Sequence, residues 1–123
     1  MQNILFYAAG AIAALWFLVH IFLGGRDIAG PLLASTELHP VVRDVNYICW
    51  HFVSVGIAGM AGFFLWGGYA SDTSLAIAGT LLASGFTLTG VAIAFKQGAS
   101  HLAVPQGWLF LPIAALGVAG LLA

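Results

Sequence analysis

Two histidines, His20 and His51, are the residues of this chain with the clearest potential for chemistry. His20 lies near the end of the first apolar run and His51 near the start of the second, so helices over both runs would place the two imidazoles at similar depths in a bilayer. A b-type haem takes two axial imidazoles of this kind. Arg26 and Arg43 lie close by in the sequence and could contact the haem propionates.

A transition-metal site is a second possibility, because the other two histidines fall on the same side of the predicted bundle. His39 and His101 lie in the connections there, and Glu37 is two residues from His39. Imidazole nitrogens with a carboxylate suit zinc, copper or iron, so the candidate ligands are His20, His51, His39, His101 and Glu37. Their spacing matches no known metal motif, since the chain has no His-x-x-x-His and no cysteine pair.

Two other roles remain open for the histidines. His20 and His51 could hydrogen-bond between helices and only fix their register. Alternatively, the protein could be an enzyme or carrier for a lipid-soluble ligand such as a lipid or a quinone, in which His51 with Asp44 or Glu37 would exchange protons.

The composition indicates that these residues belong to a membrane protein. The chain has 123 residues, of which 62% are hydrophobic and 6% are charged, whereas a soluble domain carries roughly 25% charged residues. A net charge of −1 with three basic residues excludes nucleic-acid binding by a basic surface. The single cysteine excludes an internal disulfide.

Four apolar runs set the expected fold. Each is about 18–26 residues long, and about 20 residues cross a hydrocarbon core. Continuous rather than alternating hydrophobicity predicts helices. The sequence therefore predicts an all-α integral membrane protein with one domain over 1–123 and four transmembrane helices in a compact bundle. The expected spans are about 3–24, 44–69, 74–95 and 106–123, with a short interfacial segment at 25–43.

The basic residues predict the orientation. An even number of spans places both termini on one side and the two longer connections on the other. Arg26, Arg43 and Lys96 all lie at those connections. The positive-inside rule then predicts cytoplasmic connections and both termini on the periplasmic side.

Polar residues at three- and four-residue steps predict where a pocket would form. Trp16 and Trp50 lie close to the two histidine positions and could form its walls. On the second helix, one stripe is expected to converge with the other helices on the bundle axis, and its members are Asp44, Tyr47, His51, Ser54 and Ala58.

Glycines gather on helix faces where backbones could approach closely. We expect these faces to pack helices within the bundle or against a partner, either a second copy of the chain or a larger membrane complex with this chain as accessory subunit. The residues are Gly56, Gly59 and Gly62 in the second span, Gly79 in the third, and Gly117 and Gly120 in the fourth.

Three short motifs carry a family resemblance: Leu18-Val19-His20, Trp50-His51 and Pro105-Gln106. With four spans, they resemble small uncharacterised four-helix proteins of the bacterial inner membrane. The resemblance covers the whole chain in outline and implies that location, but no activity. The leading hypothesis from the residues is binding of haem or a transition metal, and an accessory subunit or an enzyme or carrier for a lipid-soluble ligand are the alternatives.

Overall fold

The computed structural model describes residues 1–123 as helices joined by short loops, without strands, and confirms an all-helical fold of four helices. Three of them, Gln2–Ala34, Pro40–Ala70 and Thr73–Lys96, are long and apolar enough to cross a membrane, and Gln106–Leu122 is shorter. The segments are α1 Gln2–Val19, η1 His20–Ala29, α2 Gly30–Ala34, α3 Pro40–Ala70, α4 Thr73–Lys96 and α5 Gln106–Leu122.

The first connection is more helical than the sequence suggests. A span ending near residue 24 and an interfacial segment at 25–43 were expected. Instead, the first helix continues through Gly24 and Gly25 as the ten-residue π-helix η1, and α2 extends it to Ala34. Glycine is compatible with helix as well as with a break, and here Gly24 lies against Trp50: a methyl group at Gly24 would be 2.6 Å from Trp50 Cη2.

Side-chain caps start α3 and α4. The Nδ1 atom of His39 accepts the N–H of Val41 at the start of α3. The Asp72 carboxylate accepts the N–H of Ser74 at 2.9 Å at the start of α4. Ser71 joins the two helices in a left-handed conformation (φ 53°), which allows the chain to reverse within two residues.

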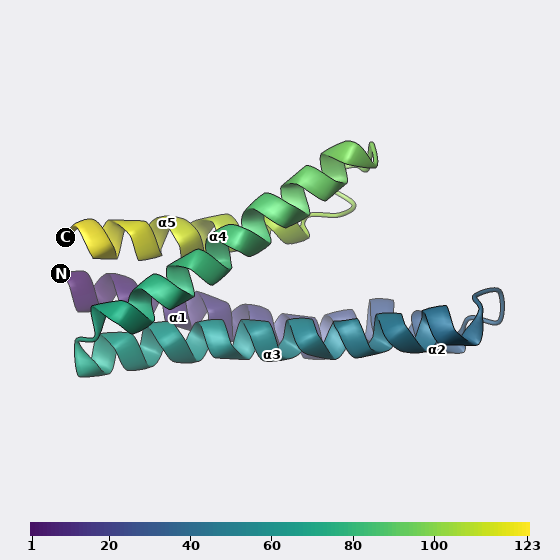
Figure 1. The fold of residues 1–123 in the computed structure, drawn as a ribbon, viewed down its shortest axis with the longest axis horizontal. Coiled ribbons are helices and arrows are strands. Elements are labelled where there is room, and N and C mark those ends of the chain that lie inside the picture. The colour runs from purple at the N-terminus through teal and green to yellow at the C-terminus, as the bar shows by residue number, and fades with distance from the viewer.

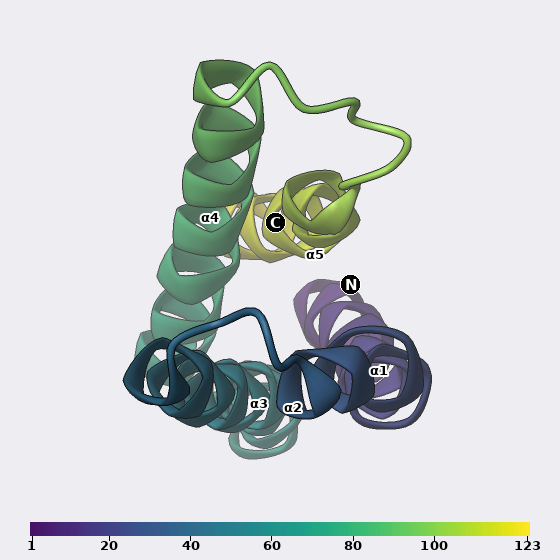
Figure 2. The ribbon, with the colours of Figure 1, turned by 90° about the vertical axis from the view of Figure 1, so that its right-hand side faces the viewer.

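The four helices form a ring that is closed at one end and open at the other. α1 packs beside α3 and α5, and α4 packs beside α3 and α5. Both termini and the turn between α3 and α4 lie at the same end (Figure 1), which we call the terminal end. From there α4 diverges from α3, and the view along the bundle shows the far end of α4 turned away from α1 and α3 (Figure 2).

Phe64 on α3 is the centre of the buried core. Its ring is fully buried and fits beside Gly79 and Gly117, where added methyl groups would lie 2.9 and 3.0 Å from ring atoms. Gly120 similarly makes room for Phe6. These three glycines therefore pack helices inside the bundle. The remaining core side chains are Ala9, Ala13, Ile57, Met60, Ala61, Ala76, Ala83, Phe110, Ile113 and Ala114.

The other predicted glycines divide into two groups. A methyl group at Gly56 would meet the Phe86 ring at 3.0 Å, so Gly56 faces α4. Gly59 and Gly62 have nothing within 4 Å of the position that a methyl group would occupy. They pack against no other helix of this chain.

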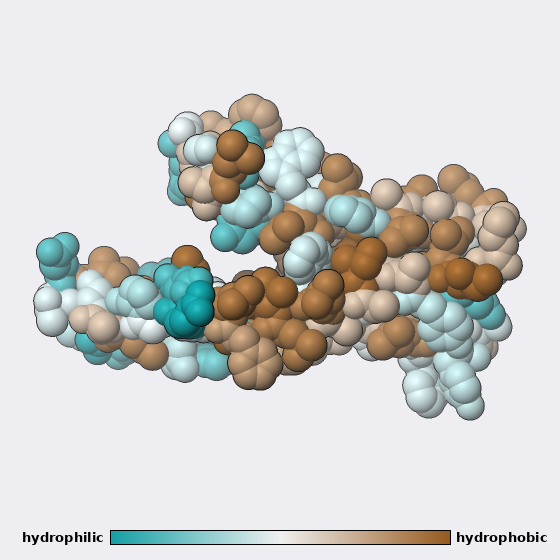
Figure 3. Space-filling model, turned by 180° about the vertical axis from the view of Figure 1, so that it is seen from behind, coloured by the Kyte–Doolittle hydropathy of each residue, from teal (hydrophilic) through white to brown (hydrophobic).

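Residues 24–49 extend beyond the end of α5 (Figure 1), and we call them the projecting hairpin. Most of the charged side chains of the chain lie in it, as the polar end of the space-filling view shows (Figure 3). These are Arg26, Asp27, Glu37, Arg43 and Asp44. Lys96 and Asp72, the other two, lie at the ends of α4.

We predict that Gly107→Ala destabilises the protein. Gly107 of α5 meets the α4 backbone so closely that a methyl group would lie 2.5 Å from Val91 N. Overpacking of this kind costs about 1–3 kcal/mol. The measurement is the unfolding midpoint in mild detergent as denaturant is added. Gly59→Ala is the matched control and should leave the midpoint unchanged or higher; equal midpoints for the two variants would contradict the close α4–α5 approach.

Candidate functional site

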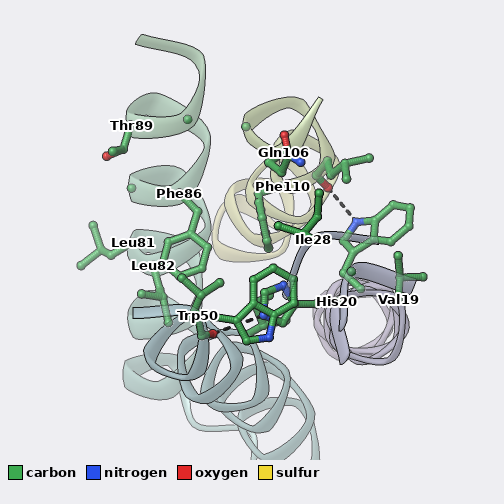
Figure 4. A pocket seen from close by; sticks show the side chains of 18 residues that line it. Val19, His20, Ile28, Trp50, Leu81, Leu82, Phe86, Thr89, Gln106 and Phe110 are labelled. Atoms are coloured by element: carbon green, nitrogen blue, oxygen red, sulfur yellow. Dashed lines mark hydrogen bonds between the residues drawn. The ribbon is translucent and has the colours of Figure 1, made fainter. Parts of the chain in front are cut away.

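A cavity of about 780 Å³ lies where α4 diverges from α3. Eighteen residues line it, and eleven of these are hydrophobic, so its surface suits an apolar ligand. The space-filling view shows the molecule hollowed between the projecting hairpin and the α4–α5 pair (Figure 3). All four helices contribute side chains to it (Figure 4).

His20, the first residue of η1, forms a polar corner of this cavity. Its Nε2 atom lies 3.1 Å from Ser54 Oγ and 3.3 Å from the Trp50 carbonyl oxygen. Its ring stacks on the Trp50 indole with centroids 3.8 Å apart and planes 16° apart (Figure 4). His20 therefore joins the first helix to α3 through both a hydrogen bond and a ring contact.

Trp16 joins α1 to α5 in the same region. Its Nε1–H donates to the Leu109 carbonyl oxygen at 2.8 Å. Pro112, three residues later in α5, lacks the N–H that would bond the carbonyl of Trp108. α5 therefore lacks one backbone hydrogen bond in the turn where the Leu109 carbonyl oxygen accepts the hydrogen bond from Trp16.

Aromatic rings from the other helix pair form the opposite wall. Phe86 of α4 and Phe110 of α5 contact edge to face, with centroids 5.0 Å apart and planes at 86°. Gln106 and Thr89 supply the only other polar side chains of the lining. The cavity thus combines an aromatic interior with few polar groups.

His51 does not line the cavity, although the sequence predicted that its stripe would face the bundle axis. It is exposed, and its ring contacts only Tyr47 of the same helix, edge-on at 4.6 Å. The neighbouring Trp50 occupies the inward position instead, in line with Ser54 and Ile57. Ser54 of the predicted stripe does face inward, but His51 does not, because a shift of one residue turns a helical side chain by about 100°.

The remaining predicted ligands are engaged elsewhere. His39 caps α3, and the Nδ1 atom of His101 accepts the Trp108 Nε1–H at 3.0 Å in the loop before α5. Glu37 is exposed in the loop before α3. Neither Glu37 nor these two histidines line the cavity.

The two arginines proposed for haem propionates pair with their own neighbours. Arg26 binds Asp27 at 2.6 Å, and Arg43 binds Asp44 at 3.1 Å. No three or more His, Cys, Asp or Glu side chains gather in a way that could hold a metal ion. His20 and His51 also face different surroundings, so the residues present do not fit a bis-histidine haem, and binding of haem or a metal is not supported.

Some lining residues could be found from the sequence and others could not. Trp16 and Trp50 were identifiable because they lie close to the histidines in the spans. Phe86, Phe110 and Gly85 were missed, because in an apolar span a lining residue has the same character as one that faces lipid.

Comparison with protein-family models, curated proteins and solved structures finds no match to this chain. Its function is therefore argued from the geometry of the cavity.

We predict that His20→Ala destabilises the protein by about 1–2 kcal/mol, because it removes an interhelical hydrogen bond and a stacked ring. His51→Ala should change stability by less than about 0.5 kcal/mol, as expected for an exposed side chain. Denaturant unfolding followed by circular dichroism measures both. A larger loss for His51→Ala than for His20→Ala would contradict the assignment of His20 as the residue that links the helices.

Proposed function

We propose that this chain is an integral membrane protein that binds a lipid-soluble, amphiphilic small molecule in the cavity between its two helix pairs. The observation that carries the proposal is an apolar, ring-lined cavity of about 780 Å³ with a polar corner at His20. Ligand cavities in proteins are of this order, about 300–1,000 Å³, and combine apolar walls with a few placed polar groups.

The exposed surface of the helices supports membrane embedding. Large apolar side chains face outward in the region of the core, among them Val55, Leu81 and Leu88, which are 72%, 68% and 70% exposed. Apolar surface of this extent is unusual for a soluble monomer, and lipid would solvate it.

The length of the helices supports a position of the cavity near a membrane boundary. A hydrocarbon core of roughly 30 Å matches about 20 helical residues. Counted from the terminal end, such a band ends near His20 on the first helix and near Trp50 on α3. The projecting hairpin then lies in water, where its five charged side chains are solvated.

The cavity supports binding or carriage more than acid–base catalysis. His51, Asp44 and Glu37, the residues that could have exchanged protons with a substrate, lie outside its lining. His20 is the only titratable side chain in the lining. A hydrophobic ligand can reach the cavity from the bilayer between α3 and α4, where Val53 and Leu81 border it.

We place the protein in the bacterial inner membrane with the projecting hairpin in the cytoplasm. The resemblance of the short motifs around His20 and Trp50 supports the location, and the positions of Arg26, Arg43 and Lys96 support the orientation. Both termini would then be periplasmic.

Cysteine labelling tests the orientation. On a Cys49→Ser background, Glu37→Cys should react with an impermeant maleimide only in inside-out vesicles, because the loop before α3 is cytoplasmic. Thr73→Cys, at the terminal end, should react only in intact spheroplasts. The reverse pattern would contradict the orientation, and labelling of both from both sides would contradict membrane embedding.

Filling the cavity tests the binding function. Gly85 lines the cavity and has open space where a side chain would begin, so Gly85→Leu should occupy the site without disturbing the helices. We expect decylbenzoquinone to quench tryptophan fluorescence saturably in the wild type and at least about tenfold more weakly in Gly85→Leu, because a fully buried leucine side chain displaces the ligand.

Gly62→Leu is the matched control, because Gly62 is equally open but lies outside the cavity. It should bind the probe like the wild type. Identical binding curves for Gly85→Leu and Gly62→Leu would show that the probe does not use the cavity, and the proposed function would then be wrong.

A further inference from the structure

We propose that the cavity selects a ring-bearing lipid that carries a hydroxyl donor, namely a phenol or hydroquinone with an apolar tail, and that His20 is the residue that accepts its hydrogen bond. This inference rests on the proposed function and specifies the chemical class of its ligand.

The contacts of His20 favour the tautomer that carries its proton on Nε2. Ser54 Oγ donates its hydrogen to the Trp50 carbonyl oxygen at 3.1 Å. The Ser54 oxygen and the Trp50 carbonyl oxygen are therefore both acceptors for His20 Nε2. An unprotonated Nε2 would lie 3.3 Å from a carbonyl oxygen with no hydrogen between them, so Nε2 carries the hydrogen.

It follows that Nδ1 of the neutral ring is an acceptor. No group of the protein donates a hydrogen bond to it, whereas Nε2 has two partners. His20 is partly exposed and lines the cavity. Because Nε2 is engaged with α3, Nδ1 is the ring nitrogen left for a ligand in the cavity, and an O–H group of the ligand would satisfy it.

The position of this acceptor is rigid. The His20 ring is stacked on Trp50 and bonded to α3, and Gly24, one helical turn later, leaves no space between η1 and the Trp50 ring. π-helical segments are rare and often occur at functional sites. Here η1 begins at His20 itself.

The walls of the cavity favour a planar ring over an acyl chain beside His20. Trp50 approaches from α3, and Phe86 and Phe110 approach from α4 and α5 (Figure 4). Aromatic rings gain additional energy from offset or edge-to-face contacts with one another. Between these rings a hydroxylated aromatic head would gain contacts that an alkyl head would not, and its tail would extend toward the bilayer.

Hydroxyl donors distinguish a hydroquinone from its quinone, because the quinone carries only carbonyl acceptors. Isothermal titration calorimetry of the detergent-purified protein under argon should give about tenfold tighter binding of decylbenzohydroquinone than of decylbenzoquinone, as expected for one hydrogen bond. The dimethyl ether of the hydroquinone has no donor and should bind like the quinone. Tetradecanol, which has a hydroxyl but no ring, should bind more weakly than the hydroquinone.

Variants at the two histidines locate the acceptor. In His20→Gln the side-chain amide can still donate to Ser54 but offers no nitrogen at the Nδ1 position, so the hydroquinone preference should disappear while quinone affinity is retained. His51→Gln, outside the cavity, should keep the preference.

Each result decides a separate point. Equal affinity for hydroquinone, quinone and dimethyl ether in the wild type would overturn the inference, even if His20→Gln failed to fold. Preference that persists in His20→Gln would overturn the role of His20, and tetradecanol binding as tight as that of the hydroquinone would overturn the ring requirement. In all three cases the cavity still binds lipid-soluble molecules. Absence of saturable binding by any probe would instead refute the proposed function.

Discussion

The architecture depends on the close approach of helices around Phe64. The ring is fully buried because Gly79 and Gly117 leave space for it on the facing helices. In the membrane that we propose for this chain there is no hydrophobic force to draw helices together, so close packing of this kind would determine where they meet. α3, α4 and α5 meet at this level, near the terminal end, and the tilt of α4 then carries its other end away from α3 (Figure 1). The closed core and the open cavity are consequences of one packing arrangement.

Side-chain hydrogen bonds link the first helix to α3 and α5 but do not link α4 to any other helix. The His20 contact with Ser54 links the first helix to α3, and the Trp16 indole links it to α5. By contrast, α4 has no side-chain hydrogen bond to another helix, since Thr80 and Thr87 both bond to carbonyls one turn earlier in α4 itself. Only van der Waals packing keeps α4 against the other helices. Its backbone approaches α5 most closely where Gly90 lies against Gly107. α4 is thus the helix around the cavity with the least polar restraint.

The sequence predicted the number of helices far better than it predicted where each helix ends and which of its residues face inward. Long continuous apolar runs determine helices whatever their neighbours, so four of them were identifiable. Their ends were harder to predict, because the Gly24-Gly25 pair suggests a break, whereas the helix continues through both residues and Gly24 packs against Trp50. On α3, Trp50 and Ser54 face inward as predicted, but His51 does not, since an apolar helix has no polar face to fix its rotation.

The cavity is open to the surroundings of the bundle, and most of the residues that line it are hydrophobic. In the bilayer that we propose for this chain, lipid acyl chains can therefore enter it and compete with any specific ligand. A specific ligand must therefore bind better than a lipid tail. Burial of apolar surface alone cannot provide that difference, because tails are buried equally well. Ring contacts with Trp50, Phe86 and Phe110 and a hydrogen bond to His20 can, because a tail has neither a ring nor a hydrogen-bond donor.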